Sequence, residues 1–488
     1  MRSRKFQATA VIALTFIFGC ERHGNTTSGD ATGENNAAVD AVFAIWDMPG
    51  SPGCALAVAQ DGALVYSRGY GYANLDYDIP VTPQTVFDVA SVTKQFNAAS
   101  IMMLVQEEKL SLDDDVRKWL PELPEYEWPI TLRHMLSHSS GLRDYLSLFP
   151  LAGRNDHFPI SHPQILQMMS RQRALVSPPG ERRSYSNTAY MLLSQILERA
   201  GGQSLGEFTA ERIFEPLAMD SSFMYENLEK IVPRRATGYD RDDDGHVRIV
   251  HNYNFDVAGD GQLYSTMENL LRWDNYLHGA EKPEFYSLLM TKARLNNGEP
   301  IEDANGIRRR DFRGLHTVGH SGSSWGFRTE LVRFVKHGLS IAISCNSDSA
   351  NPQYLARQVA DHYLAEQLDS RIDDTASSSD DHVAEPASAP PVLTPDQLAE
   401  FAGEFFSPEL DATYRFAVVD GGLDLRIEQE LPLDVVPIAT DRFEASFHPQ
   451  GWGGPSTINL EFDRNQAGAV TGFGLSLGSE QGIVFERR

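Results

Sequence analysis

Strand-like segments lie at both ends of residues 53–345, and helical segments lie between them. Residues 53–72 alternate apolar and polar side chains around Asp61-Gly62, a two-residue turn that suits the twist of a β-hairpin. Residues 316–345 indicate a meander of further strands. Helical periodicity is found at residues 91–108, 131–137 and 188–200. This order predicts an α+β domain, because the first and last strands must pair across a helical insertion to form one antiparallel sheet.

The composition of the chain changes near residue 369. Residues 369–393 are rich in Ser, Asp, Ala and Pro, which predicts an extended, disordered linker. Residues 394–488 contain short alternating strands separated by turns, and this pattern predicts a small all-β barrel. We therefore expect a larger domain over residues 38–368 and a barrel domain after the linker.

The N-terminus has the pattern of an export signal over residues 1–20. Basic side chains precede an apolar run at residues 8–18 that is too short to span a bilayer. The run ends in Phe18-Gly19-Cys20, which resembles a bacterial lipobox with Cys20 as the lipidated residue. Because Phe18 is bulkier than the usual residue there, ordinary signal cleavage remains an alternative. We expect residues 21–37 to form a flexible tether and the protein to be a membrane-anchored periplasmic lipoprotein.

The formal net charge of -25 at pH 7 restricts the partners of the protein. So acidic a chain is not expected to bind nucleic acid or to dock on anionic lipid by electrostatic attraction. The predicted lipid anchor is then its only contact with a membrane. The sequence makes no prediction of the oligomeric state.

A Ser-x-x-Lys motif, Ser91-Val92-Thr93-Lys94, opens one of the predicted helices. Residues three apart lie on the same face of a helix, so the lysine amine would lie beside the serine hydroxyl. A partly desolvated lysine near a helix start can activate a serine without a histidine. Taken alone the motif is weak, because a helix-capping serine followed by an exposed lysine gives the same pattern.

Two further motifs follow in order along the chain. Tyr185-Ser186-Asn187 begins a predicted helix, and Gly319-His320-Ser321-Gly322 lies in a predicted strand. Ser-x-x-Lys, Tyr-x-Asn and a His-x-Gly in the place of Lys-Thr-Gly resemble the motifs of the serine beta-lactamase and penicillin-binding-protein superfamily. The resemblance is strongest to its class C and DD-peptidase branch, and residues 130–145 resemble a signature stretch of that branch.

The resemblance implies an antiparallel five-stranded sheet flanked by helices, an all-α subdomain, and an active site between the two. It also implies that the C-terminal barrel is lipocalin-like and that the first and last strands of the sheet are neighbours. Cys54 opens the first strand and Cys345 closes the last. In an oxidising compartment these two cysteines could form a disulfide, and two buried thiols are the alternative.

The same resemblance assigns roles to the motif residues. It makes Ser91 the nucleophile, Lys94 its neighbouring base, and Tyr185 the general base and acid. Asn187 would bind the acyl amide of the substrate and Lys94. The backbone N–H groups of Ser91 and Ser323 would form the oxyanion hole. The expected substrate-binding strand contributes His320, Ser321 and Gly322.

His320 departs from the lysine that class C beta-lactamases carry at this position. Histidine is mostly neutral near pH 7, so we expect weaker recognition of a beta-lactam carboxylate. Some DD-peptidases, D-aminopeptidases and esterases of the superfamily also have histidine here. This departure favours a peptidase or an esterase.

No cofactor and no metal site are predicted. The segment Asp240 to Gly245 resembles the start of an EF-hand, but His251 occupies the position of the bidentate glutamate, so a polar turn is favoured. His134 and His138 are four residues apart on a predicted helix, without a third ligand, so they are interpreted as a structural pair.

The leading hypothesis is a serine hydrolase that forms an acyl-enzyme with a small peptide, amide or ester. Its expected substrates contain D-amino acids, as for a D-Ala carboxypeptidase or a D-aminopeptidase. A beta-lactamase or an esterase is the alternative within the same chemistry. A non-catalytic binding protein is the alternative of another class, but a binder would not need Ser91, Lys94, Tyr185 and Asn187 together.

Overall fold

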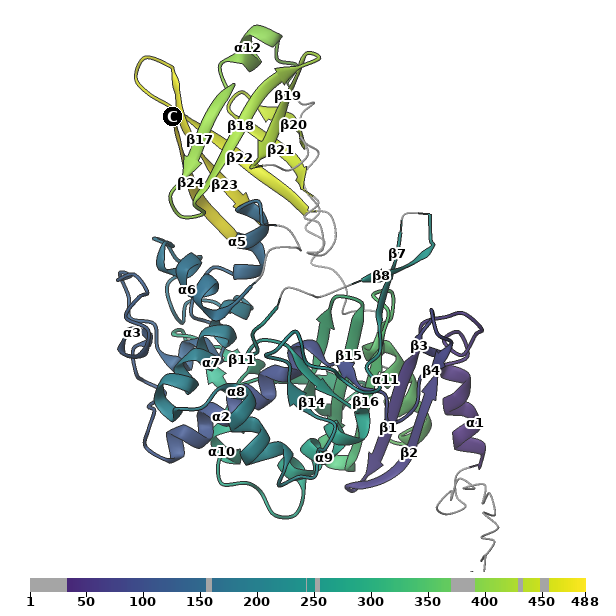
Figure 1. Ribbon diagram of the computed structural model, residues 1–488. Helices are drawn as coiled ribbons and strands as arrows, with labels where there is room; N and C mark the ends of the chain where they lie inside the picture. The colour runs from purple at the N-terminus through teal and green to yellow at the C-terminus, as the bar shows by residue number, and fades with distance from the viewer. Residues whose placement is uncertain are drawn as a thin grey trace, which may run out of the picture.

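The protein consists of a large α+β domain and a C-terminal barrel that stands above it in Figure 1. The computed structural model describes residues 33–154, 160–242, 244–250, 255–369, 391–428, 433–447 and 456–488. The predicted signal segment with Cys20, most of the predicted tether and most of the predicted linker lie outside these residues.

An antiparallel sheet forms the centre of the large domain, as predicted. Its order is β12-β13-β14-β15-β16-β1-β2, so the described residues form seven strands where five were expected. The two additional strands, β12 and β13, extend the sheet beyond β14. The strands are β1 (Cys54–Gln60), β2 (Ala63–Tyr70), β12 (Asp303–Ala304), β13 (Ile307–Phe312), β14 (Leu315–Ser324), β15 (Phe327–Phe334) and β16 (Leu339–Cys345).

The first and last long strands of the sheet pair with each other across the helical insertion. β1 is antiparallel to β16, and their register places Cys54 opposite Cys345. The two cysteines form a disulfide, which joins positions 291 residues apart. The predicted hairpin between β1 and β2 is also confirmed, because Asp61 and Gly62 both have positive φ, at 50° and 82°.

Helices cover both faces of the sheet, which explains why β1 is buried along nearly its whole length. On one face α1 (Gly33–Val42) and α11 (Pro352–Tyr363) bury apolar side chains such as Val39 and Val359 against β1 and β16. α1 therefore begins within residues 21–37, the stretch predicted as a tether. The other face packs against α2 (Thr93–Gln106) and α9 (Met267–His278).

α2 is buried on nearly all sides and runs between the sheet and the helical subdomain (Figure 1). Its buried polar side chains have partners. The Asn97 amide donates to the backbone carbonyls of Tyr190 and Gly259, at 2.8 and 3.0 Å, and Gln95 accepts from the Trp273 indole at 2.9 Å. These bonds fix the helix that carries the Ser-x-x-Lys lysine.

Short helices and α7 build the helical subdomain. Ser204 is the N-cap of α8 in a capping box with Glu207, and Thr266 is the N-cap of α9. The remaining helices of the large domain are α3 (Val116–Trp119), α4 (Leu132–Leu136), α5 (Tyr145–Leu151), α6 (His162–Ser170), α7 (Asn187–Gly201), α8 (Leu205–Thr209), α10 (Tyr286–Met290), the π-helical η2 (Ala210–Phe214), and the 3₁₀ turns η1 (Ala90–Val92) and η3 (Val335–His337).

Short strands of the large domain form several small sheets beside the central one. The segment that resembled an EF-hand start lies in the hairpin of β7 and β8, where Asp242 accepts the backbone N–H of His246 at 2.8 Å; His251 is outside the described residues. The short strands are β3 (Tyr72–Asn74), β4 (Ile79–Pro80), β5 (Phe87–Asp88), β6 (Phe223–Met224), β7 (Gly238–Arg241), β8 (Val247–Val250), β9 (Leu263–Ser265), β10 (Ala293–Arg294) and β11 (Pro300–Ile301).

The C-terminal domain is a closed barrel of eight strands, preceded by α12 (Pro395–Ala399). Its interior is filled by aromatic side chains, among them Phe405, Phe416, Phe462, Phe473 and Phe485. The strands are β17 (Gly403–Ser407), β18 (Ala412–Val419), β19 (Gly422–Ile427), β20 (Leu433–Ala439), β21 (Arg442–Phe447), β22 (Ser456–Arg464), β23 (Val470–Leu477) and β24 (Glu480–Arg487).

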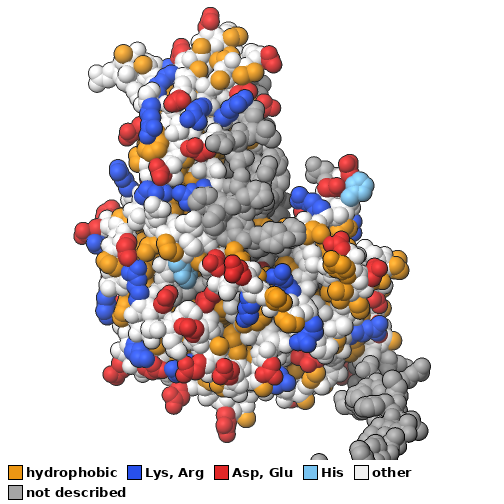
Figure 2. Space-filling view, in the orientation of Figure 1, with side chains coloured by type: hydrophobic (Ala, Val, Ile, Leu, Met, Phe, Trp, Pro, Cys, Tyr) orange, Lys and Arg blue, Asp and Glu red, His pale blue; other side chains and the backbone are white. Residues whose placement is uncertain are grey.

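The surface view shows the barrel as a lobe that projects from the large domain (Figure 2). Acidic and basic side chains are both scattered over the visible face, with many acidic ones on the large domain. Within the described residues, no helix is both long and apolar enough to cross a membrane.

Candidate active site

Ser91 lies in the 3₁₀ turn η1, one residue after a strained backbone position. Ala90 has a φ of 49°, a conformation that costs a non-glycine residue on the order of 1–3 kcal/mol. Asp88 holds this turn, because its carboxylate accepts the Ala90 N–H at 2.8 Å and the Ser324 hydroxyl at 2.6 Å. The turn that presents Ser91 is therefore tied directly to β14.

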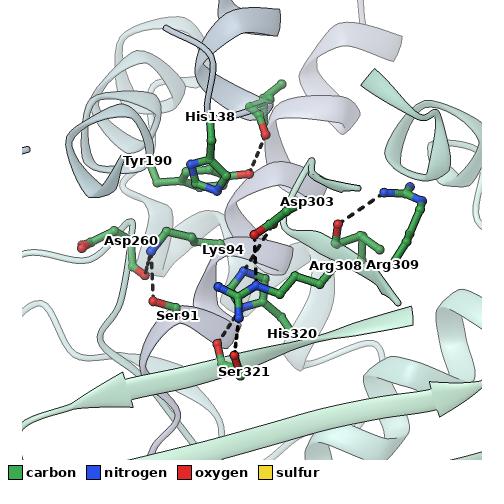
Figure 3. A network of polar contacts seen from close by, with 12 residues as sticks. Ser91, Lys94, His138, Tyr190, Asp260, Asp303, Arg308, Arg309, His320 and Ser321 are labelled. Atoms are coloured by element: carbon green, nitrogen blue, oxygen red, sulfur yellow. Dashed lines mark hydrogen bonds and ion pairs between the residues drawn. The ribbon is translucent and has the colours of Figure 1, made fainter. Parts of the chain in front are cut away.

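Lys94 is fully buried in the first turn of α2 and donates to three acceptors. Its Nζ lies 3.1 Å from Ser91 Oγ, 2.9 Å from Asn187 Oδ1 and 2.7 Å from the Asp260 carbonyl oxygen. Figure 3 shows the side chain between Ser91 and Asp260. These three oxygen atoms surround the amine and fix its position beside Ser91.

Asn187 and Tyr185 flank the start of α7. Ser186 caps this helix by accepting the Ala189 N–H at 3.1 Å. The cap turns Asn187 towards Lys94, while the Tyr185 ring centre lies 5.0 Å from Lys94 Nζ. The structure thus brings the serine, the lysine, the tyrosine and the asparagine of the predicted motifs to one place.

A cavity of about 410 Å³ opens at this point. Apolar side chains, including Phe255 and Trp325, whose rings lie 4.8 Å apart, form part of its wall. A volume of this size can hold a small ligand. The sequence-predicted residues that line it are Ser91, Tyr185, Asn187, Ser321, Gly322 and Ser323.

Gly322 has a role that its place in the sequence motif did not indicate. A Cβ atom at this position would lie 2.2 Å from the Val89 carbonyl oxygen and 3.1 Å from the Ala90 Cβ. The absence of a side chain therefore lets the turn that carries Ser91 approach β14 closely. From the sequence, Gly322 was expected as part of the substrate-binding strand.

The His320 side chain is not among the groups that line the cavity. It is fully buried, its Nδ1 lies 2.6 Å from the Ser321 carbonyl oxygen, and its Nε2 lies 4.0 Å from Asp303 Oδ1. Burial, together with the nearby Arg308 guanidinium, lowers the pKa of His320 to about 3. The ring is therefore neutral near pH 7, as expected, but it lies beneath the cavity wall.

Arg308 on β13 lines the cavity and was not predicted as a site residue. Its Nη1 lies 2.5 Å from Ser321 Oγ and its Nε lies 3.0 Å from Asp303 Oδ2 (Figure 3). The signal in the sequence was the run Arg308-Arg309-Arg310 in an alternating strand, which directs the first and third side chains to the same face. Only the pairing of β13 with β14 shows that Arg308 reaches Ser321.

His138 is a second residue that sequence reasoning missed. It lies beyond the end of α4 with a φ of 54°, and its ring stacks on Tyr185 at 4.3 Å between centres. Its Nδ1 accepts the Ser186 N–H at 3.2 Å, whereas His134 Nδ1 accepts the Thr131 N–H within the α4 capping box. The interpretation of the two histidines as one helical pair is therefore wrong, because the helix ends before His138.

Asp303 lies between the two buried histidines. Burial favours its neutral form, but the cations around it, His320 and His138 when protonated and Arg308 and Arg183 at all times, lower the pKa of Asp303 below its usual value. Its Oδ1, His138 Nε2 and His320 Nε2 are all buried without a hydrogen-bond partner. Among the described residues, no group of three or more His, Cys, Asp or Glu side chains could hold a metal ion.

Two buried carboxyl groups complete the site. Asp260 accepts the Tyr145 hydroxyl, at 3.3 and 3.2 Å to its two oxygens, and burial raises the pKa of Asp260 to about 6. Asp144 accepts the Asn187 N–H at 2.6 Å, and burial raises its pKa as well. Asp144 thus contacts Asn187, which accepts from Lys94, and Asp260 itself accepts from Lys94 through its backbone carbonyl oxygen.

The chain is similar to known proteins of one family. The family model described as Beta-lactamase matches residues 39–365. A penicillin-binding protein of Bacillus subtilis is 29% identical over 331 residues, which are 63% of this chain and 71% of that protein. A D-aminopeptidase of Gluconobacter oxydans is 30% identical over 316 residues, which are 64% of this chain but only 59% of the aminopeptidase.

A solved structure extends the likeness in fold to the barrel end of the chain. The octameric penicillin-binding protein homologue from Pyrococcus abyssi has a TM-score of 0.59 at 24% identity. The match covers 93% of this chain and 100% of that one.

Proposed function

The chain belongs to the beta-lactamase family, and from this we propose that it is a serine hydrolase that forms an acyl-enzyme on Ser91. The observation that carries the proposal is the position of Lys94 Nζ, 3.1 Å from Ser91 Oγ and 2.9 Å from Asn187 Oδ1 in a site that Tyr185 also lines. A serine beside a base and inside a cavity is the arrangement that nucleophilic catalysis requires.

The reaction follows from the positions of these groups. Ser91 Oγ attacks the acyl carbon of the substrate while its proton moves to the neighbouring Lys94 and Tyr185 pair. Ser91 and Ser323 both line the cavity, and their backbone N–H groups would stabilise the oxyanion. The proton then passes to the leaving group, and the acyl-enzyme is hydrolysed by water with Tyr185 as the base.

We propose a peptide with a D-amino acid at the scissile bond and a free carboxylate as the substrate class. Arg308 and Ser321 place a cation and a hydroxyl together on one side of the cavity, which suits a carboxylate. The aromatic wall with Phe255 and Trp325 suits an apolar acyl group. The D configuration is supported by the name of the D-aminopeptidase relative.

A D-aminopeptidase is the second candidate, and one observation favours it. Asp260 is an acidic residue that lines the cavity, and a substrate ammonium group is the partner that its charge would suit. A beta-lactamase also remains an alternative, because Arg308 supplies a permanent cation that the neutral His320 does not.

A labelling experiment and a substrate screen test these proposals. A fluorophosphonate probe should label the wild-type protein and leave Ser91→Ala unlabelled; equal labelling of both proteins would refute a Ser91 nucleophile. The screen compares D-Ala-D-Ala peptides, D-amino-acid amides, nitrophenyl esters and nitrocefin. The carboxypeptidase proposal expects the free-carboxylate peptides to have the highest kcat/KM, whereas preference for the amides would favour an aminopeptidase.

We also propose that the protein is a periplasmic lipoprotein anchored through Cys20, on the lipobox-like pattern of the sequence. A labelled fatty acid should be incorporated into the full-length chain and should be lost in Cys20→Ser. Export of both forms without any fatty acid would instead support ordinary signal cleavage.

A further inference from the structure

We propose that the C-terminal barrel is a positioning part of the active site, which holds Lys94 in place through the segment Arg143 to Tyr145. This proposal rests on the function proposed above. It assigns to the barrel a role in acylation, although all the described residues that line the cavity belong to the large domain.

Residues of the barrel bind Arg143, whose guanidinium is fully buried where the two domains meet. Nη1 donates to Glu409 Oε1 at 2.9 Å, and Nη2 donates to the Gln481 and Gly482 carbonyl oxygens at 2.8 and 3.3 Å. The same Glu409 oxygen accepts the Arg173 N–H at 2.8 Å. Removal of one partner from a buried ion pair is strongly destabilising, so we expect the contact between Arg143 and Glu409 to persist in the folded protein.

The next residue, Asp144, is held from both sides. Its backbone N–H donates to Glu480 Oε1 of the barrel at 3.2 Å. Its side chain faces the other way, where Oδ2 accepts the Asn187 N–H at 2.6 Å and Oδ1 accepts the Leu146 N–H at 3.0 Å. A single residue thus joins the barrel to the first residue of α7.

Two further bonds tie the same segment to α7. The Thr188 hydroxyl donates to the Arg143 carbonyl oxygen at 2.8 Å and accepts the Tyr145 N–H at 2.8 Å. The start of α7 cannot shift against the segment without breaking these bonds. Asn187 is therefore positioned by residues that the barrel itself positions.

Tyr145 extends the connection to the second protein partner of Lys94. Its hydroxyl donates to the Asp260 carboxyl, and the Asp260 carbonyl oxygen accepts from Lys94 Nζ at 2.7 Å. Two of the three acceptors of Lys94 belong to Asn187 and Asp260. Both residues are hydrogen-bonded to the segment Arg143 to Tyr145, which is itself bonded to the barrel. The third acceptor is Ser91 itself.

The packing of the barrel interior supports a role in positioning. Phenylalanine side chains such as Phe473 and Phe485, stacked at 4.4 Å, fill its centre, so it is a packed body. If the barrel fixes the position of Lys94, it should influence the chemical step more than substrate binding. Small displacements of a catalytic group strongly reduce the rate of the reaction.

The test compares full-length variants at Glu409 with a control on the same barrel. Glu409→Ala removes the ion-pair partner of Arg143, whereas Glu409→Gln keeps an acceptor. Glu404→Ala is the control, because it removes an exposed ion pair with Arg415 on the outside of the barrel. The readouts are the fluorophosphonate acylation rate, kcat and KM for the best substrate, and hydrogen exchange at the Asn187 amide.

We expect Glu409→Ala to lower the acylation rate and kcat by about tenfold or more, with KM within about twofold. Exchange at the Asn187 amide should become faster. Glu409→Gln should restore most of the rate, and Glu404→Ala should behave as the wild type. Should Glu409→Ala not fold, Glu480→Ala, which removes the acceptor of the Asp144 N–H and of the Ser479 hydroxyl, gives the same comparison.

An acylation rate and an Asn187 exchange rate in Glu409→Ala equal to those of the wild type would overturn the proposal, and so would a rise in KM at unchanged kcat. Failure of the proposed function is distinguishable from this outcome, because the wild-type protein itself would then not be labelled at Ser91.

Discussion

The Arg308 guanidinium on β13 donates to the Ser321 hydroxyl on β14, with 2.5 Å between nitrogen and oxygen. Both residues line the cavity that contains Ser91. The pair brings a permanent positive charge to the stretch of β14 beside the neutral His320. We therefore expect the carboxylate end of a substrate to lie against β14.

Arg308→Ala should raise KM for a D-Ala-D-Ala peptide by about tenfold or more, because a charge-assisted hydrogen bond to the carboxylate is lost. Hydrolysis of a nitrophenyl ester without a carboxylate should change much less. Steady-state kinetics with both substrates measures the difference. Arg310→Ala, on the same strand but outside the cavity, is the control. A parallel loss with both substrates would contradict a carboxylate contact.

Lys94→Ala should reduce the acylation rate by on the order of 10²–10⁴, because the neighbouring base of Ser91 is removed. The free energy of unfolding should also fall, by about 1–3 kcal/mol, since Asn187 and the Asp260 carbonyl lose a buried donor. Stopped-flow labelling and urea unfolding report the two effects. Unchanged acylation would refute the role of the lysine, and Lys118→Ala, at an exposed lysine of α3, serves as the control.

The stability of the protein should depend on pH through Glu480. Burial, reinforced by Asp144, raises its pKa from 4.5 to about 7, although nearby Arg143 acts in the opposite direction. Between these values the native state binds a proton that the unfolded chain has released, so this contribution to stability is present at low pH and is lost as the pH rises to about 7.

Glu480→Gln should therefore reduce the fall in unfolding free energy between about pH 4.5 and pH 7 by on the order of 2 kcal/mol. Urea unfolding at several pH values measures the slope. Glu486→Gln, an exposed position on the same strand, should leave it unchanged. Identical slopes in wild type and Glu480→Gln would show that Glu480 does not titrate in this range.

The disulfide between Cys54 and Cys345 should stabilise the large domain, because it closes a loop across 291 residues. The double variant Cys54→Ala, Cys345→Ala should lose about 2–4 kcal/mol of unfolding free energy. Its kcat should stay near the wild-type value, since neither cysteine lines the cavity. Urea unfolding with and without a reductant checks the result, and an equal midpoint under both conditions in the wild type would contradict it.

Gly322→Ala should impair activity because the new Cβ would lie 2.2 Å from the Val89 carbonyl oxygen and displace the turn of Ser91. We expect acylation to fall by about tenfold or more. Gly261→Ala is a matched control, because Gly261 also lines the cavity but a Cβ atom added there would have no other atom within 4 Å. Equal acylation rates in the two variants would count against this role of Gly322.

Much of the fold could be predicted from local pattern. The alternation of residues 53–72, the Asp61-Gly62 turn and the order of strands and helices indicated an antiparallel sheet with first and last strands as neighbours. These features depend on side-chain periodicity and turn chemistry, which are properties of short stretches of chain. The width of the sheet was not predictable in this way, because β12 consists of only two residues.

The candidate site was predictable where one element carries its own geometry. Ser91 and Lys94 are one helical turn apart, so spacing alone placed the amine beside the hydroxyl, whereas the roles of both residues and of Asn187 came from the family resemblance. His320 shows the opposite case. Its motif position suggested a substrate contact, yet its side chain is directed to Asp303, and Arg308 from the next strand lines the cavity.

The sequence by itself determined the chemical groups: a hydroxyl beside an amine, a tyrosine and an asparagine at a helix start, and a glycine that allows close approach. Only the tertiary structure decided which other charges meet them, because Arg308, His138 and the barrel residue Glu409 reach the site or its supports from distant parts of the chain. Periodicity fixes which face a side chain occupies within its own element. The neighbour on that face depends on how strands pair and domains dock, and local sequence does not encode it.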